Sequence, residues 1–377
     1  MQIRKIRFIE PGNPPYRRLL RNLWTYEEHL RNPSIGLLTL TTIVKDRVED
    51  TLMYSESISY INWDDVLDAD IVFLGMFSFA APRGYELAEK IRANSSACVV
   101  IGGLHASLNV EEAAAHCDYV LLGEADESIL EFIDCLERDV PVSFPGVAWL
   151  HEGALTSTGK RLAPQDINTI PNRDLIFRYR KMAGHNTLWP QVHASRGCPD
   201  NCDYCVIIQH FGRRVRTRCP ENIVEDIRQA IAFHDDRPIP RLTKALWVTD
   251  DNFFADRAWA LSVLKAIIAS DVRYRFTIQA RYEVGFDDEM LDLLKRAGFV
   301  ELAMGIEFME DESFALHHKK SRRDDIIRAI HNIQRHGIRV RGLFMMGADT
   351  HSPGIGERLA AFVEEHEVRG VLIQSMY

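Results

Sequence analysis

Three cysteines constrain this chain more than any other feature of its sequence. Cys198, Cys202 and Cys205 follow the spacing C-x3-C-x2-C. Thiolates this close in sequence can converge on one soft metal centre. Three ligands are one short of a site closed by four thiolates, so a [4Fe–4S] cluster held here keeps one iron open to a non-protein ligand. The preceding segment, 191–197, reads as a strand that ends in a glycine turn, and α/β folds hold their chemistry at such strand ends.

Two other interpretations of the cysteines remain open at this point. One is a disulfide pair with a spare thiol, although nothing else in the sequence indicates an oxidising compartment. The other is a structural zinc site, which needs a fourth ligand and usually brings a second C-x2-C or a histidine pair. Cys219 and His210 are near in sequence, but neither has a paired spacing.

Composition narrows the class of protein. The chain has 377 residues, enough for two domains, and 46% of them are hydrophobic. No apolar run approaches the roughly 20 residues of a membrane helix, and the N-terminus enters a strand rather than a secretory signal, so we expect a soluble cytoplasmic protein. A net charge of −9 argues against a broad nucleic-acid surface. The basic run 213–218 reads as a solvated loop or as a local anion contact beside the cysteines.

Residues 1–140 are expected to form one domain. Five apolar segments read as strands, at 5–9, 51–55, 71–77, 98–103 and 119–124. Helical patterns separate them, at 36–44, at 83–91 and in a segment that ends near 135. This alternation predicts a doubly wound, parallel, Rossmann-like sheet. Residues 141–189 read as a hairpin and a linker.

Residues 190–377 are expected to form a second domain. Six strands, five of them followed by a helix, are predicted at 191–197, 242–249, 274–280, 300–306, 338–346 and 370–374. This order predicts a partial (β/α)6 TIM-like barrel that is open on one side. The sequence stops directly after the last strand, so we expect either a C-terminally truncated chain or closure of the barrel by a substrate or partner.

The cysteine segment resembles a known family. Residues 196–205, Arg-Gly-Cys-Pro-Asp-Asn-Cys-Asp-Tyr-Cys, are similar to the cluster loop of the radical S-adenosylmethionine (SAM) superfamily, including the aromatic Tyr204. The resemblance implies a [4Fe–4S] cluster on the three cysteines and SAM chelated to the open iron. It also implies that an electron, from a donor such as flavodoxin or ferredoxin, cleaves SAM to a 5′-deoxyadenosyl radical.

The resemblance also assigns a role to polar residues at the predicted strand ends. Acidic groups there can meet the ammonium and ribose hydroxyls of SAM, and an arginine can meet its carboxylate. Capping of the following helix is the alternative role for each acid. The candidate SAM contacts are Tyr204, Asp250, Asp251, Asn252, Arg281, Glu307 and Gly347. His317, in a charged segment, is expected to be solvated, with a substrate contact as the alternative.

Two glycine turns at strand ends of the first domain form another resemblance. With the segment 33–38, the turns 102–106 and 122–126 look like the cobalamin-binding domain that precedes many radical SAM domains. Glycine lets a ligand approach the backbone. The candidate cobalamin contacts are Gly102, Gly103, His105, Gly123 and Glu124. The Asp-x-His-x-x-Gly signature of cobalt-ligating domains is absent from the sequence, so we do not assign His105 as a cobalt ligand.

Together these features predict a radical SAM enzyme that uses cobalamin to methylate an unactivated carbon of a small-molecule, lipid or peptide substrate. Cobalamin-assisted cyclisation or rearrangement without methyl transfer is an alternative. A non-catalytic cobalamin or redox sensor is another. No catalytic side chain is assigned from the sequence, and neither a nucleic-acid partner nor a membrane span is expected.

Overall fold

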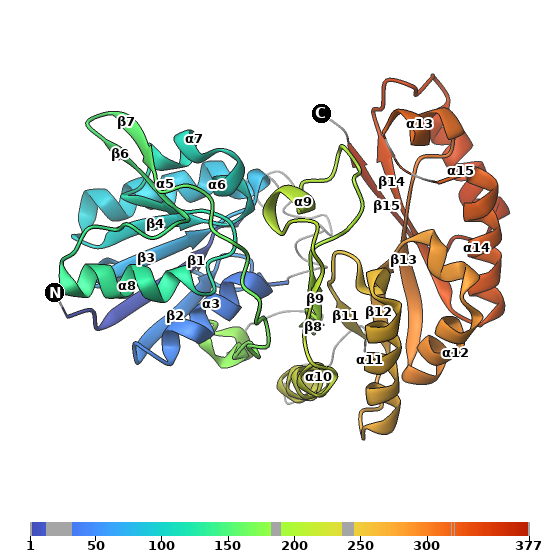
Figure 1. The fold of residues 1–377 in the computed structure, drawn as a ribbon, viewed down its shortest axis with the longest axis horizontal. Helices are drawn as coiled ribbons and strands as arrows, with labels where there is room; N and C mark the ends of the chain where they lie inside the picture. Colours follow the sequence, from blue (N-terminus) through green and yellow to red (C-terminus); the bar gives the residue numbers. More distant parts are fainter. Residues whose placement is uncertain are drawn as a thin grey trace. The chain divides into compact units, whose positions relative to one another are not determined.

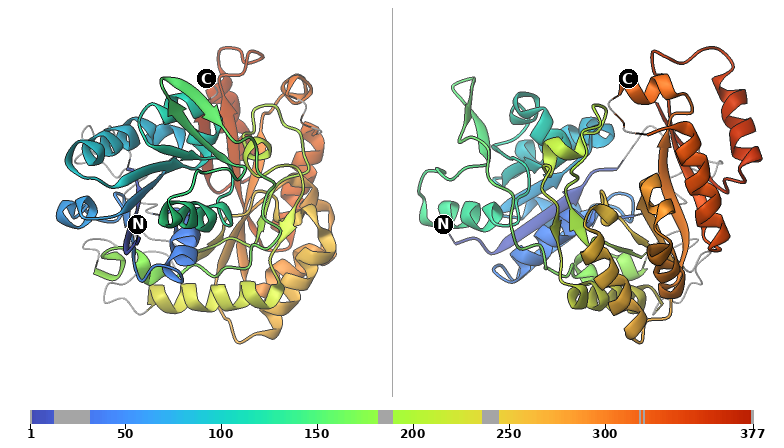
Figure 2. Two further views of the ribbon diagram at one scale, coloured as in Figure 1. Left: turned by 60° about the vertical axis from the view of Figure 1, so that its left-hand side comes forward. Right: turned by 45° about the vertical axis from the view of Figure 1, so that its right-hand side comes forward.

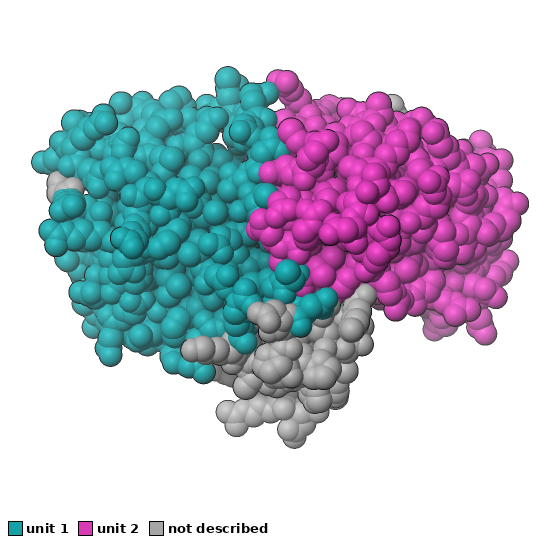
Figure 3. Space-filling model, turned by 90° about the horizontal axis from the view of Figure 1, so that it is seen from below, with its two compact units in different colours: residues 1–189, 209–211, 232–243 teal, residues 190–208, 212–231, 244–377 magenta. Residues whose placement is uncertain are grey.

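The structure is a computed structural model that describes residues 2–12, 32–181, 190–235, 245–317, 319 and 321–375. The chain divides into two compact units, which are coloured separately in Figure 3. The first comprises Met1–Trp189, Gln209–Phe211 and Ala232–Thr243, and the second comprises Pro190–Ile208, Gly212–Ile231 and Lys244–Tyr377. Each unit has its own sheet. No helix in these described ranges combines the length and apolar character needed to cross a bilayer.

A seven-stranded sheet organises the first unit (Figure 1). Its strand order is β2-β1-β3-β4-β5-β6-β7, and the first five of these strands are parallel. The strands are β1 (Lys5–Glu10), β2 (Asp50–Ser55), β3 (Ile71–Gly75), β4 (Cys98–Gly102), β5 (Tyr119–Leu121), β6 (Val147–His151) and β7 (Ala154–Ser157). From the sequence, a hairpin was predicted to follow the first domain. In the structure its two strands, β6 and β7, belong to the sheet of the first unit and extend it in antiparallel pairing.

Helices cover both faces of this sheet because alternate strand residues point to opposite sides. Phe8 and Phe73 belong to the core under α3 (Ile35–Lys45) and α8 (Ser128–Arg138). Ile9 and Leu74, their neighbours in sequence, belong to the core on the other face. The elements there are α4 (Trp63–Leu67), η1 (Ser78–Ala80), α5 (Ala81–Asn94), α6 (Leu104–Leu108) and α7 (Val110–Ala114). The connection to the second unit contains η2 (Arg173–Leu175) and η3 (Tyr179–Lys181). The predicted doubly wound arrangement is confirmed.

The second unit contains six parallel strands in chain order, β8-β11-β12-β13-β14-β15 (Figure 2). They are β8 (Gln191–Val192), β11 (Leu246–Val248), β12 (Phe276–Ala280), β13 (Phe299–Glu307), β14 (Arg339–Met346) and β15 (Val371–Ser375). The edge strands β8 and β15 each have one neighbour in this sheet as described, so the barrel is partial, as predicted.

Helices connect these strands and bury the outer face of the sheet in one large core. The connecting elements are α9 (Ile207–His210), α10 (Pro220–Asp235), η4 (Phe253–Ala255), α11 (Arg257–Ala269), η5 (Tyr282–Phe286), α12 (Asp288–Ala297), α13 (Asp311–Leu316), α14 (Arg323–Arg335) and α15 (Ile355–Glu365). The predicted strand before the cysteines is shorter than expected. After Val192 the chain leaves the sheet, and β9 (Ser195–Arg196) pairs instead with β10 (Arg216–Thr217).

Candidate active site

The three cysteines lie on a loop that follows β9, at the carboxyl end of the parallel strands of the second unit. All three are free thiols and partly exposed. The turn before them depends on Gly197, which has φ +94° and whose place for a Cβ atom lies 2.5 Å from the Arg214 carbonyl oxygen. Only glycine fits this close approach of two backbones. The Cys198 amide also donates to the Gly212 carbonyl oxygen at 3.3 Å, so the segment 212–214 supports the loop.

The thiol chemistry fits a soft metal centre. Burial raises the pKa of the Cys198 thiol to about 11 and also raises that of Cys205. Because a metal takes the thiolate form, loading this loop would release protons. Across the described residues, no three His, Cys, Asp or Glu side chains converge tightly enough to hold a single metal ion. The fit to a cluster therefore rests on the donor set and its position at the strand ends.

Asp250 ties the start of the cysteine loop to the end of β11. It is fully buried, and its two carboxylate oxygens accept hydrogen bonds from the Ala194 amide at 2.7 Å and the Ser195 hydroxyl at 2.6 Å. These bonds replace the sheet pairing that the chain gives up after Val192. Burial raises the pKa of Asp250 to about 7. A contact of Asp250 with SAM was predicted from its position; these bonds give it a positioning role, and the contact itself stays a prediction.

The next two residues also contact the loop directly. The Asp251 carboxylate accepts a hydrogen bond from the Gly197 amide at 3.0 Å. The side-chain amide of Asn252 lies 3.7 Å from the Cys198 sulfur and 3.3 Å from the Asp200 carboxylate. Asp250, Asp251 and Asn252 are thus gathered at the cysteine loop, as their place at a strand end predicts. Their contact with a ligand stays a prediction.

Arg281 follows β12 and faces the same loop. Its guanidinium lies 3.2 Å from the Asp200 carboxylate and 2.7 Å from that of Glu283. The charge-assisted pairs hold the guanidinium in place and raise the pKa of Arg281 further above its ordinary value, although burial opposes this. Arg281 is therefore close to the cysteine loop, and the predicted contact with a SAM carboxylate would compete with these two acids.

Glu307 ends β13 in an unusual conformation. Its φ is +66°, and the register between β13 and β14 shifts between Gly305 and this residue. A non-glycine residue in the left-handed region costs on the order of 1–2 kcal/mol, and such strain is found at functional sites. The buried Lys319 ammonium lies 3.5 Å from the Glu307 carboxylate and donates to the Gly305 carbonyl oxygen at 2.8 Å.

The sequence analysis missed Lys319. The residue follows α13 in the charged run His-His-Lys-Lys, which reads as a solvated segment. Burial lowers its pKa, while the nearby Glu307 carboxylate opposes that shift. Gly347, the last candidate in this unit, has φ +97°, and its amide donates to His351 Nδ1 at 3.2 Å.

Aromatic side chains pack behind the loop. Tyr204 meets the rings of Phe308 and His317 edge-on, each at a centroid distance of 6.0 Å. His317 stacks on Phe308 at 4.9 Å, and its Nδ1 lies 3.1 Å from the Asp203 carboxylate. The expectation that His317 is solvated is wrong, because its side chain is only 12% exposed. Tyr204 is thus part of an aromatic wall, and its contact with SAM stays a prediction.

In the first unit, the turn after β4 approaches β3 closely. Gly103 has φ +95° and ψ −174°, and its place for a Cβ atom lies 3.0 Å from both the amide nitrogen and the carbonyl oxygen of Met76. His105 is buried with both ring nitrogens engaged. Its Nε2 lies 2.9 Å from the Tyr85 hydroxyl, and its Nδ1 lies 3.1 Å from the Ser78 hydroxyl. The histidine therefore joins α5, α6 and η1, and a ligand contact by its ring stays a prediction.

The turn after β5 is more open. Gly123 has φ +70°, no atom lies within 4 Å of its place for a Cβ, and its amide donates to the Ser107 hydroxyl at 2.9 Å. Glu124 is buried beside it. Two exposed rings lie near these turns. Phe77 and Phe79, which flank Ser78, are 45% and 64% exposed and stack at 5.7 Å. This strand edge therefore combines open backbone with an apolar aromatic surface.

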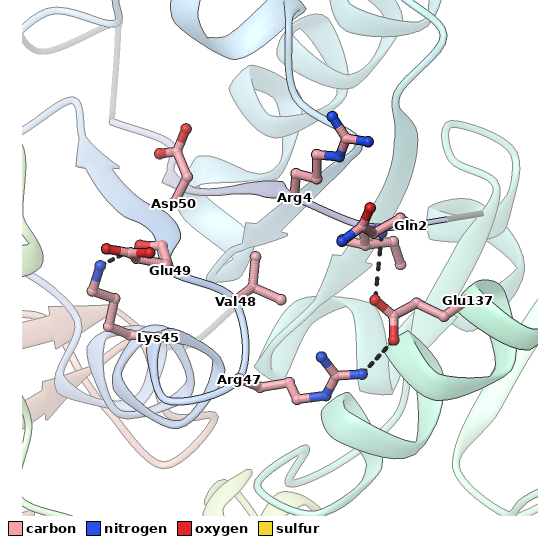
Figure 4. Close-up of a pocket in the computed structure, with 9 residues that line it drawn as sticks. Gln2, Arg4, Lys45, Arg47, Val48, Glu49, Asp50 and Glu137 are labelled. Carbon is pink, nitrogen blue, oxygen red and sulfur yellow. Dashed lines mark hydrogen bonds and ion pairs between the residues drawn. The ribbon is translucent and has the colours of Figure 1, made fainter.

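A charged hollow lies at the opposite, amino-terminal edge of the same sheet (Figure 4). Arg4, Lys45 and Arg47 contribute its cations, and Arg47 forms an ion pair with Glu137. None of the candidate residues lies there, so the hollow is separate from the predicted chemistry.

Comparison with known proteins assigns the second unit. Residues 192–362 match the model of the radical SAM superfamily. The matched segment contains the cysteine loop and the strands β11, β12, β13 and β14. The match confirms the family that the cysteine loop predicts.

Relatives of known or suggested activity extend along most of the chain. An uncharacterised methyltransferase of Synechocystis sp. is 24% identical over 95% of this chain and 63% of its own length. The hopanoid C-2 methylase of Rhodopseudomonas palustris is 25% identical over 89% of this chain and 60% of its own length. The bacteriochlorophyllide d C-8(2)-methyltransferase of Chlorobaculum tepidum is 23% identical, with 91% and 72% covered. The chain thus spans about 60% of the first two relatives.

Solved structures share the fold over nearly the whole chain. TsrM from Kitasatospora setae, a radical SAM methyltransferase solved with cobalamin and a [4Fe–4S] cluster, has a TM-score of 0.77 at 15% identity; 99% of this chain and 72% of TsrM are covered. OxsB, a cobalamin-dependent radical SAM enzyme, has a TM-score of 0.75 at 14% identity, with 99% and 53% covered. These matches confirm the predicted fold class.

Proposed function

We propose that this radical SAM protein is a cobalamin-dependent methyltransferase that acts on an unactivated carbon. The observation that carries the proposal is the loop of three free thiols at the carboxyl ends of the barrel strands in a radical SAM domain. The methylase and methyltransferase relatives support methyl transfer. The fold shared with TsrM supports cobalamin as the second cofactor.

The cysteine loop would hold the cluster, with Cys198, Cys202 and Cys205 as ligands. The cluster and SAM together supply a carbon-centred radical, and the protein binds, orients and shields the reactants. Asp250 and Asp251 fix the loop backbone through Ala194, Ser195 and Gly197. Asp251, Asn252 and Arg281 contact the loop, and together with Glu307 and Gly347 they are the proposed SAM contacts.

The first unit would hold cobalamin at the carboxyl edge of its sheet. The turns at Gly102–Gly103 and at Gly123 bring bare backbone to that edge, which is where open α/β sheets bind ligands. Phe77 and Phe79 add an exposed aromatic surface suited to a large macrocycle. Because the His105 ring is engaged at both nitrogens, it is not available to ligate cobalt in this conformation.

The proposed substrate is a small molecule or a lipid. The relatives' names specify a hopanoid and a bacteriochlorophyllide. A peptide is the alternative substrate class. The free thiols agree with a reducing compartment such as the cytoplasm. A one-electron donor protein is needed to reduce the cluster.

A ring-closing reaction without methyl transfer is the second candidate. The observation that favours it is a relative, the anaerobic magnesium-protoporphyrin IX monomethyl ester cyclase of Rubrivivax gelatinosus, which is 21% identical over 73% of this chain. Both reactions would begin with SAM cleavage. They differ in the product, because only methyl transfer gives a product that is heavier than the substrate by a methylene unit.

Anaerobic reconstitution with iron, sulfide and hydroxocobalamin tests the proposal. We expect bound cobalamin in the absorption spectrum, cluster absorbance near that of other [4Fe–4S] proteins, and 5′-deoxyadenosine after addition of SAM and a strong reductant. Cys202→Ala should abolish both the cluster absorbance and SAM cleavage. Cys219→Ala, which removes an exposed cysteine outside the motif, is the matched control and should retain both.

A wild-type protein that binds cobalamin but forms no 5′-deoxyadenosine would contradict an enzyme and favour the sensor interpretation. Retention of cluster and cleavage in Cys202→Ala would contradict the ligand assignment.

A further inference from the structure

The basic run 213–218 separates into two inward and two outward arginines. Arg216 and Arg218 are buried, and Arg218 forms an ion pair with Asp226 at 2.7 Å. Arg213 and Arg214 are exposed. In the described part of the chain, neither of these two guanidinium groups has a carboxylate within 4.0 Å, whereas eight other arginines of the second unit do. The run is therefore neither wholly structural nor wholly solvated.

The two exposed arginines are attached to the cysteine loop itself. The Arg213 guanidinium donates to the Pro199 carbonyl oxygen at 3.0 Å, one residue after Cys198. The Arg214 backbone lies against Gly197, one residue before Cys198. The Cys198 amide is hydrogen-bonded to Gly212 at 3.3 Å, which gives a short bonded route from this surface to the first cysteine.

The acids of the loop are already engaged elsewhere. Asp200 pairs with Arg281, and Asp203 pairs with His317. Pro199, whose carbonyl oxygen accepts the hydrogen bond from Arg213, is exposed and uncharged. The chain as a whole has a net charge of −9, which repels an acidic protein on average. Arg213 and Arg214 therefore form a local exception to that repulsion, next to the proposed cluster.

We infer that Arg213 and Arg214 form the docking surface for an acidic one-electron donor protein that reduces the cluster. The inference rests on the proposed function, since it requires a cluster on Cys198. One electron leaves the reduced donor and is taken up by the cluster, so the donor is oxidised by one electron and the cluster is reduced by one. Electron transfer falls steeply with distance, and a partner held by these arginines approaches the loop at Cys198. The arginines steer the partner electrostatically and take no part in SAM cleavage.

Rapid-mixing measurements of cluster reduction in the reconstituted protein test this inference. Two reductants are compared, namely reduced flavodoxin, an acidic protein, and reduced methyl viologen, a small cation that needs no docking surface. The variants are Arg213→Glu/Arg214→Glu and the charge-conserving Arg213→Lys/Arg214→Lys. Arg273→Glu/Arg275→Glu is the matched control, because it makes the same change in net charge with exposed arginines at the amino-terminal edge of β12. Arg214→Glu alone keeps the hydrogen bond from Arg213 to the loop.

At low ionic strength we expect the Arg213→Glu/Arg214→Glu rate with flavodoxin to fall by about tenfold, with a weaker dependence on salt. Arg214→Glu alone should lower the rate of reduction by flavodoxin in part. The lysine variant and the Arg273/Arg275 control should stay within about twofold of the wild-type rate, because steering follows local charge. Reduction by viologen should not fall in any variant.

Two results would overturn the inference alone. One is an unchanged flavodoxin rate in Arg213→Glu/Arg214→Glu. The other is an equal loss in the Arg273/Arg275 control or in the lysine variant. A wild-type protein whose cluster neither reductant can reduce would refute the proposed function together with the docking surface.

Discussion

The carboxyl edges of the two sheets use different chemistry to present a ligand. In the first unit the edge is built from glycine backbone, a neutral hydrogen-bond network around His105, and the exposed rings of Phe77 and Phe79. In the second unit the edge carries charges in fixed pairs, such as Arg281 with Asp200 and Lys319 with Glu307. The first suits a large, mostly apolar ring, and the second suits a compact zwitterion.

The difference extends to how each edge is held in place. The first edge depends on glycines with a positive φ, one of which, Gly103, also has no room for a side chain. The second edge depends on buried charged groups that need their partners. Removing a buried charged partner is costly because the remaining charge has lost its water. Crowding a glycine turn costs less, because strain spreads over a few bonds. Substitutions at both edges and in the cores behind them test this contrast.

The largest effect is expected at the buried ion pair behind the cysteine loop. Arg218 donates to Asp226 and to the His193 carbonyl oxygen, both at 2.7 Å, and the Asp226 side chain is fully buried. Arg218→Ala should lower the free energy of unfolding by about 3–5 kcal/mol in urea denaturation, since it removes the buried cationic partner of Asp226. The exposed pair of Arg257 with Asp287 is the control, and Arg257→Ala should cost about 0–1 kcal/mol. Equal costs at the two sites would contradict the role of burial.

The pH dependence of the free energy of unfolding should differ between Asp250→Asn and the wild-type protein. Burial raises the pKa of Asp250 to about 7, against 3.8 for an exposed aspartate, so between these values the folded protein keeps a proton that the unfolded chain has released. The stability tied to this proton is complete below pH 4 and is lost as the pH rises through 7. This group should lower the free energy of unfolding by up to about 1.4 kcal/mol per pH unit in that window.

Asp250→Asn should remove that slope, as measured by urea denaturation at several pH values. In the first unit, burial of the carboxylate end of Glu10 also raises its pKa to about 7, so Glu10→Gln provides a matched comparison. If Asp250→Asn keeps the wild-type slope, Asp250 is ionised in the folded protein. Its two hydrogen-bond donors would then stabilise the charged carboxylate about as well as bulk water does.

The smallest effect is expected at the glycine turns. Gly103→Ala should destabilise the protein by about 2 kcal/mol, because φ +95° with ψ −174° is a glycine conformation and the new Cβ would lie 3.0 Å from Met76 backbone atoms. Gly123→Ala should cost only about 1 kcal/mol, since its Cβ would meet no atom within 4 Å.

Cobalamin binding sharpens this test. If the open space at Gly123 receives the cofactor, Gly123→Ala should weaken cobalamin binding more than its small effect on stability explains. Equilibrium titration of the apoprotein with hydroxocobalamin measures this. Tight binding in Gly123→Ala, at wild-type affinity, would place the cofactor elsewhere.

The regular parts of the fold could be predicted from the sequence. Short apolar runs separated by helical patterns gave the parallel strands β1 to β5 and the six strands of the barrel, because burial on both faces requires such runs. The hairpin β6–β7 was expected, but not its addition to the first sheet. The pairing of Val120 with Ala148, 28 residues further along the chain, depends on an edge strand that local pattern does not reveal.

The sequence predicted which residues lie at the candidate site better than it predicted the contacts that these residues make. Strand-end counting gathered Asp250, Asp251, Asn252, Arg281 and Glu307 around the cysteine loop, because carboxyl ends of parallel strands meet at one edge. Counting missed Lys319 and placed His317 in solvent, since both lie after α13, where neither period nor strand end marks an inward position.

The sequence by itself determined the cysteine spacing, the family it indicates and the order of strands and helices, because these depend on residues close together along the chain. Only the tertiary structure decided which groups are free to meet a ligand. Asp250 reaches Ala194 across 56 residues and His105 reaches Tyr85 across 20. Hydrogen-bond partners at such separations are set by how sheets and helices pack, and no spacing along the chain encodes them.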